Sequence, residues 1–353
     1  MLVKIKSNNQ NIEIYMKHIV EKKVRVNFKK KSKVLILQAR DLIKKNINIK
    51  KITKHFNDEG IIIIKNVLNK QKCNFFINLL EKNYTSYKHS YFTTKKKKIP
   101  THSQDYNAKT VSNLHNKDIK FLKFLDHPII LPLVTSFLQQ GSYMKSDKII
   151  CQSLVARSPI GKCNCQQLHN DARLIGSYFP LVIQVMWTLD RFTKNNGSTR
   201  FVIGSHRFMK FPKNRKVYNG EIVAEVPSGS AIIFNAALWH GSSKIKTSPN
   251  RRWGIICRYA RWFLKPSFDF NFNTPAKIYK RLNSFQKELL GFKFNPPKDE
   301  FERTSARSKK PIKPKNYYLP KRFRSGRTNS VTSSNPTPNC LVSQVPESVG
   351  VFL

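Results

Sequence analysis

The chain has 353 residues, of which 40% are hydrophobic and 11% aromatic, so it is long and apolar enough to fold around a full core and is not a disordered polypeptide. No apolar run approaches the about 20 residues of a membrane helix, and the six cysteines are expected to be reduced thiols because a chain of this length needs no disulfide staples. The net charge of +45 is spread along the chain, which favours a compositional origin over a dedicated phosphate-binding surface.

The N-terminal third is predicted to hold one strand and two helices. Residues 1–50 are expected to be a basic extension, with a helix near residues 34–45 where apolar residues fall at helical spacing. A turn and the isoleucine run 61–64 predict a strand, and residues 71–83 predict an amphipathic helix. Residues 84–118 are polar and Lys-rich, so a long loop is expected there, in the position of a substrate lid.

From residue 148 the pattern changes to short β-rich segments separated by Gly and Asn turns. This pattern favours a mainly β domain with flanking helices and two stacked sheets, as in a jelly roll. The predicted strands are 148–156, 181–189, 200–203, 221–226, 231–238 and 253–259. A helix is expected at 277–290. We therefore predict a folded domain over 51–302 and a disordered, basic, Ser- and Pro-rich tail over 303–353.

Two histidines and a carboxylate are the candidate metal ligands. His169 and Asp171 are two residues apart, so on an extended segment both side chains point to the same side. His240 comes much later in the chain, and only a folded sheet could bring it to them. Two imidazoles and one carboxylate form the ligand set of non-haem Fe(II) oxygenases, so the three residues predict an iron site.

Four stretches of the sequence resemble the phytanoyl-CoA dioxygenase family: 55–68, 167–171, 187–207 and 229–252. The third stretch, with Asn-Gly followed by Gly-Ser-His, is the most specific, although Ile203 stands where the family usually has proline. The resemblance implies a double-stranded β-helix fold and an oxygenase that uses Fe(II), 2-oxoglutarate and O2. It also implies that His169, Asp171 and His240 are the metal ligands, whereas His206 belongs to a loop and is not one.

The resemblance also points to residues that bind 2-oxoglutarate. An arginine after the second histidine holds the far carboxylate in the family, because a guanidinium group can pair with a carboxylate through two hydrogen bonds. Counting from His240 gives Arg251, and counting back from the end of the following strand gives Arg252, which we prefer. Ser242 and Trp187 match positions that line the family's cofactor pocket.

The sequence therefore predicts an Fe(II)/2-oxoglutarate-dependent hydroxylase of a small, possibly lipid-like or acyl, substrate, with release of succinate and CO2. Hydroxylation is favoured over halogenation because related halogenases lack the carboxylate that Asp171 supplies. Two alternatives are a basic nucleic-acid-binding protein and an inactive family member; nucleic acid is not favoured as a partner because the basic residues do not cluster with aromatic ones. Without an apolar signal core near the N-terminus, a cytoplasmic location without a membrane span is expected, while the oligomeric state stays open.

Overall fold

An uninterrupted run of isoleucines forms one of the inner strands of the fold. In the computed structural model of the protein, Ile61, Ile62 and Ile64 of this strand are completely buried, because both faces of the sheet around them are covered. The structure describes residues 34–44, 48–87, 108–142, 147–159, 165–176, 179–213, 218, 220–246 and 251–294.

Seven strands form the larger sheet, and all neighbours run antiparallel except the first pair, which is parallel. In spatial order they are β1 (Leu35–Gln38), β2 (Ile61–Lys65), β8 (Ser230–Asn235), β5 (Val182–Thr188), β10 (Gly254–Arg261), β4 (Ile149–Pro159) and β3 (Ala108–Val111). Strand β5 lies in the middle and pairs with β8 on one side and β10 on the other. Successive side chains on it therefore point alternately to the two faces of the sheet.

A smaller sheet of three strands covers one face of the larger sheet. Its strands, in spatial order, are β7 (Glu221–Val223), β6 (Thr199–Val202) and β9 (His240–Ser242). Phe201 of β6 packs with Ile63 of β2 and with Ile232 and Phe234 of β8 in one buried apolar cluster. The two sheets are thus stacked as a double-stranded β-helix, which confirms the fold class predicted from the sequence.

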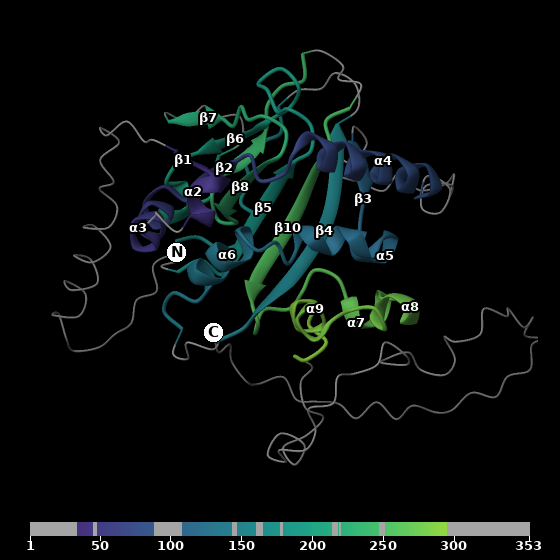
Figure 1. Ribbon diagram of the computed structural model, residues 1–353. Coiled ribbons are helices and arrows are strands. Elements are labelled where there is room, and N and C mark those ends of the chain that lie inside the picture. Colours follow the sequence, from purple (N-terminus) through teal and green to yellow (C-terminus); the bar gives the residue numbers. More distant parts are fainter. Residues whose placement is uncertain are drawn as a thin grey trace, which may run out of the picture. The chain divides into compact units, whose positions relative to one another are not determined.

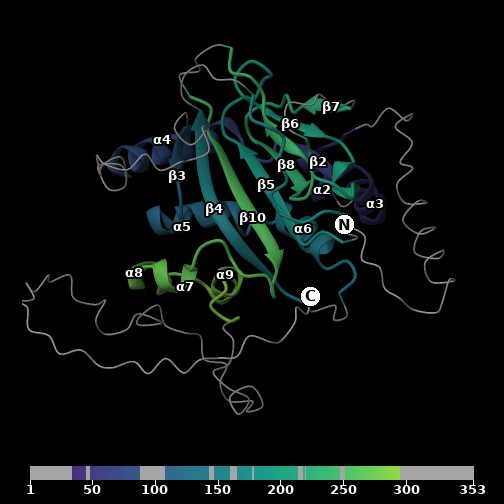
Figure 2. The same cartoon turned by 180° about the vertical axis from the view of Figure 1, so that it is seen from behind.

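Helices cover the other face of the larger sheet (Figures 1 and 2). Phe76 and Phe137 from two of these helices share the main core with Val185, Ile233 and Cys257 from the sheet. The helical segments are α2 (Ala39–Ile43), α3 (Ile49–Glu59), α4 (Lys70–Tyr87), α5 (Leu114–Lys117), η2 (Ile119–Phe124), α6 (Ile130–Leu138), η3 (Ser205–Arg207), α7 (Phe270–Asn273), α8 (Ala276–Tyr279) and α9 (Ser284–Leu289). Because one face packs on helices, the polar side chains of the sheet gather on the face toward β6 and β9.

A glycine joins α3 to β2 and fixes the angle between them. Asn48 caps the start of α3 by accepting hydrogen bonds from the backbone of the first turn, and Gly60 ends the helix with φ 80°. That left-handed conformation favours glycine. In addition, a Cβ atom at Gly60 would lie 2.5 Å from Nδ1 of His206, so the position has no room for a side chain.

Several predicted elements differ from the structure. Residues 34–45 are a strand followed by a short helix, β1 and α2, instead of one helix, and the folded domain consequently begins before residue 50. The segment before β2 is the helix α3, not a turn. Within 84–118, α4 continues to Tyr87 and both β3 and α5 are present, so the expected long loop is wrong for these parts. The single helix at 277–290 is two short helices, α8 and α9.

The strands predicted from residue 148 onward are each found, with ends shifted by a few residues, and the helix predicted at 71–83 is α4. The tail over 303–353 lies outside the described residues. Among the residues that the structure describes, no helix combines the length and the apolar character needed to cross a membrane.

Candidate metal centre

The segment that carries His169 and Asp171 is hydrogen-bonded through its backbone to the residues before β9 and to His240, the first residue of β9. His169 and His240 exchange both backbone hydrogen bonds, at 2.9 and 3.0 Å, and the backbone N–H of Asp171 donates to the carbonyl of Ala236. This antiparallel pairing places the two histidines opposite each other, with ring centroids 4.4 Å apart. The fold therefore brings together residues that are far apart in the sequence.

The three candidate ligands converge on one point. Oδ1 of Asp171 lies 3.6 Å from Nε2 of His169, and Oδ2 lies 3.5 Å from Nε2 of His240. One ligand atom from each residue lies within 4.8 Å of the other two. Two imidazole nitrogens and one carboxylate on a single side of a site match the donor set of a ferrous ion with open coordination positions.

Hydrogen bonds orient both imidazoles toward this point. Nδ1 of His169 lies 3.1 Å from the carbonyl oxygen of Gln167, and Nδ1 of His240 lies 2.8 Å from that of Leu238. Because a carbonyl oxygen only accepts, each Nδ1 must carry the hydrogen, and in the neutral ring Nε2 then keeps its lone pair. Metal-binding histidines are typically held in this way by a carbonyl behind the ring.

The protonation states also suit a cation. Burial, together with the nearby His240, lowers the pKa of His169 to about 4, so this imidazole is neutral at pH 7. Burial alone would raise the pKa of Asp171, but its interactions with His240, His169 and Arg258 outweigh burial and hold that pKa well below its usual value. A neutral ring and an ionised carboxylate are the forms that bind metal ions.

The three residues lie at the wall of a cavity of about 790 Å³ between the two sheets. Four arginines line it, namely Arg157 of β4, Arg173 after the metal-binding segment, Arg252 before β10 and Arg258 within β10. Asp171 is the only carboxylate among the described residues of its lining. The cavity is therefore strongly basic before any ligand is bound.

The structure distinguishes the two arginines that the sequence left open. Arg252 lines the cavity, its backbone N–H donates to Oγ of Ser158 at 2.8 Å, and its guanidinium carbon lies 4.2 Å from the centre of the Phe192 ring. Arg251 is exposed and does not line the cavity; its Nε donates to Asp190 at 3.2 Å. Of the two, only Arg252 is positioned to reach a ligand in the cavity.

The other two predicted cofactor residues lie on different sides of the sheet. Ser242 lines the cavity, but Trp187 does not. Its side chain is completely buried in the main core, 5.3 Å from the ring of Phe124. The reason is the alternation along β5, where Met186 faces the cavity and its neighbour Trp187 faces the helices. Trp187 was expected to line the cofactor pocket, and it does not line this cavity.

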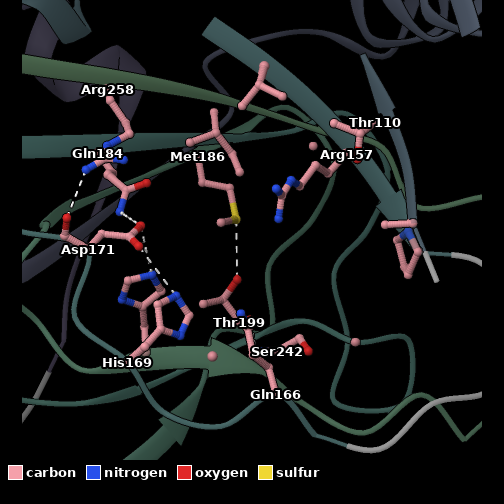
Figure 3. A pocket seen from close by; sticks show the side chains of 18 of the residues that line it. Thr110, Arg157, Gln166, His169, Asp171, Gln184, Met186, Thr199, Ser242 and Arg258 are labelled. Atoms are coloured by element: carbon pink, nitrogen blue, oxygen red, sulfur yellow. Dashed lines mark hydrogen bonds and ion pairs between the residues drawn. The ribbon is translucent and has the colours of Figure 1, made fainter. Parts of the chain in front are cut away.

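Two residues near the metal ligands were not found from the sequence. Gln184 donates a hydrogen bond from Nε2 to Oδ2 of Asp171 at 2.6 Å, and Arg258 donates from Nη2 to the backbone carbonyl of Asp171 at 3.0 Å. Figure 3 shows both residues beside Asp171 on the side away from His169. A glutamine between Ile183 and Val185 in an otherwise apolar strand was the available signal, because a buried amide needs a partner.

Among the described residues, neither His206 nor Cys165 belongs to the candidate metal cluster. His206 lies in the short helix η3, and its Nε2 is 2.9 Å from the backbone carbonyl of Asn57 in α3. Cys165 is a free, exposed thiol that lines the cavity, while Cys163 lies outside the described residues.

The sequence matches one protein family and is similar to several known proteins. A family model described as phytanoyl-CoA dioxygenase (PhyH) matches residues 56–253. An uncharacterized protein of Mycobacterium tuberculosis is 25% identical over 155 residues, which cover 43% of this chain and 56% of that protein. A protein of Aspergillus novofumigatus, named an Fe(II)/2-oxoglutarate-dependent dioxygenase, is 28% identical over 113 residues, covering 31% of this chain and 36% of that protein. The chain thus spans about half the length, or less, of the curated relatives it matches.

Among solved structures, HygX from Streptomyces hygroscopicus, with nickel and 2-oxoglutarate bound, is similar with a TM-score of 0.49 and 15% identity. The similarity covers 62% of this chain and 89% of that one.

Proposed function

Because the chain belongs to the phytanoyl-CoA dioxygenase family, we propose that it is a non-haem Fe(II)- and 2-oxoglutarate-dependent dioxygenase that hydroxylates a small molecule. The observation that carries the proposal is the convergence of His169, Asp171 and His240 at the wall of a basic cavity. These residues would hold Fe(II) through Nε2 of each imidazole and the carboxylate of Asp171.

The co-substrate would be held by other residues that line the same cavity. Arg252 offers a planar, always charged group for the far carboxylate of 2-oxoglutarate, and Phe192 supports its guanidinium group. Ser242 adds a hydroxyl on the facing strand. When bound, Fe(II), 2-oxoglutarate and O2 supply an oxidation in which one oxygen atom of O2 enters a substrate C–H bond and the other enters succinate, with release of CO2. The residues of the chain orient the reactants and exclude water.

The kind of substrate follows from the charges of the cavity. One arginine suffices for 2-oxoglutarate, but Arg157, Arg173 and Arg258 also line the space. With a dipositive metal, Asp171 and the dianionic co-substrate in place, the described lining still carries excess positive charge. This excess supports a substrate with a carboxylate or phosphate group, acyl compounds included. The family match does not favour the alternative of a nucleic-acid-binding protein.

An anaerobic titration tests the proposal. Fe(II) and 2-oxoglutarate added to the full chain are expected to produce a weak visible charge-transfer band, and Asp171→Ala and His240→Ala should each abolish it. Exposure of the wild-type complex to O2 is then expected to convert 2-oxoglutarate to succinate. A band that persists in both variants would refute the ligand assignment, and a chain that forms neither band nor succinate would refute the function.

A further inference from the structure

We infer that Gln184 and Arg258 are positioning residues that hold Asp171 so that only one of its carboxylate oxygens is offered to the metal. The inference rests on the proposed function and deepens it, because the binding mode of this carboxylate decides how many coordination positions remain for the reactants.

The first observation is the hydrogen bond of Gln184. Its Nε2 lies 2.6 Å from Oδ2 of Asp171, and its side chain is 3% exposed at the middle of the central strand β5. A buried amide without a partner costs about 1–3 kcal/mol, so this donor is committed to the carboxylate. Oδ2 therefore already accepts a hydrogen bond from the amide at the position where it also lies 3.5 Å from Nε2 of His240, whereas Oδ1 lies 3.6 Å from Nε2 of His169.

The second observation is that Arg258 holds the main chain of the same residue. Nη2 of Arg258 donates to the carbonyl oxygen of Asp171 at 3.0 Å. Arg258 and Gln184 are directly opposite each other in the antiparallel pairing of β10 with β5. Strand β10 thus holds the backbone of Asp171, and the neighbouring strand β5 holds its side chain (Figure 3).

The consequence concerns the number of open positions. Two imidazoles and one oxygen of a carboxylate leave three positions of a six-coordinate ferrous ion open. A carboxylate that binds through both oxygens would leave two, enough for the keto acid but not for O2 as well. A donor on Oδ2 makes the second mode less favourable. Gln184 would therefore keep the position for O2 accessible.

The test compares two buried glutamines of the larger sheet. Gln184→Met keeps the length of the side chain but removes the donor. Gln152→Met is the matched control, because Gln152 is also buried, in β4, and donates to the carbonyl of Lys265, apart from the metal ligands. The readouts are the dissociation constant of Fe(II), measured anaerobically by calorimetry on the full chain, and the electron paramagnetic resonance signal of nitric oxide added to the Fe(II)·2-oxoglutarate complex.

We expect Gln184→Met to weaken Fe(II) binding roughly 10- to 100-fold. At saturating Fe(II) and 2-oxoglutarate, it should also bind nitric oxide less tightly than Gln152→Met does. Gln184→Asn, which keeps an amide but is too short to reach Oδ2, should change both readouts in the same direction and serves if the methionine variant does not fold. A Gln184 variant that matches the Gln152→Met control in both readouts would overturn this inference alone. Wild-type protein that binds no Fe(II) would overturn the proposed function and this inference together.

Discussion

The guanidinium carbon of Arg252 lies 4.2 Å from the centre of the Phe192 ring, so this arginine is fixed at the cavity wall by an aromatic side chain. Its neighbour Arg251 instead pairs with Asp190 outside the cavity. Adjacent residues of an extended segment point in opposite directions, so Arg252 lines the cavity and Arg251 does not.

Arg252→Gln is expected to raise the dissociation constant of 2-oxoglutarate roughly 10- to 100-fold, the usual effect of losing hydrogen bonds to a charged group. Arg251→Gln, which removes the same charge next to it, should leave that constant nearly unchanged. Both values can be read from anaerobic titrations of the Fe(II)-loaded protein. Equal effects of the two substitutions would contradict the assignment.

The basic lining of the cavity predicts a preference among substrates. In a panel of carboxylic acids paired with their uncharged primary amides, the acids should stimulate succinate formation at least about tenfold more, because guanidinium groups bind carboxylates through charge-assisted hydrogen bonds. Arg157 of β4 and Arg173 line the cavity in addition to Arg252. If the amides were the better partners, the surplus arginines would have a purpose other than substrate recognition.

Two glycines with nearly the same backbone conformation allow a stability test of the junction between α3 and β2. Gly291→Ala should cost about 1 kcal/mol, since Gly291 has φ 83° and open space where a Cβ would be. Gly60→Ala, at φ 80°, should cost about 2–4 kcal/mol, because the added Cβ also meets His206 and Leu238. Urea unfolding of both variants measures the difference. Similar losses would show that the contact with His206 relaxes without cost.

Burial of His115 predicts a loss of stability in acid. Burial lowers its pKa from 6.5 to about 4, and Nε2 lies 3.0 Å from Oγ1 of Thr274. Between these pH values the unfolded chain binds a proton that the folded chain does not. His115 therefore makes the free energy of unfolding larger above about pH 6.5 than in acid, by at most about 3 kcal/mol. This difference is lost as the pH falls toward 4.

The replacement His115→Gln removes this titration but keeps a polar side chain beside Thr274. Unfolding free energies measured from pH 7 to pH 4 should fall less steeply in the variant than in the wild type. Other histidines whose pKa is lowered by burial, the half-buried His127 and the buried His206, titrate in both proteins and cancel in the comparison. Parallel curves for the two proteins would contradict the prediction.

The parts of the fold that the sequence predicted are those with a strong local pattern. The β-branched runs of β2, β5 and β8 are buried on both faces and stand out as apolar segments. Strand β9 has three residues and owes its structure to pairing with β6, which no local pattern reveals. In β1, the apolar run Leu35–Leu37 also fits a helix, and only its parallel pairing with β2 decides for a strand.

The candidate site likewise contains residues that the sequence predicted and residues that it did not. His169, Asp171 and His240 could be chosen because residue type, spacing and family resemblance agreed. Trp187 could not be placed, since a strand covered on both faces has apolar residues on both sides, and the pattern does not tell which side meets the cavity. Gln184 was overlooked because its role depends on the register of β5 with β10, a long-range feature.

The most direct test of the account is the position of the metal. Crystals of the full chain grown anaerobically with Fe(II) should give one strong anomalous difference peak at the iron absorption edge. The peak is predicted within coordination distance of Nε2 of His169, Nε2 of His240 and a single oxygen of Asp171. A peak elsewhere, for example at the Cys165 thiol or at His206, with none between these three residues, would contradict the central claim.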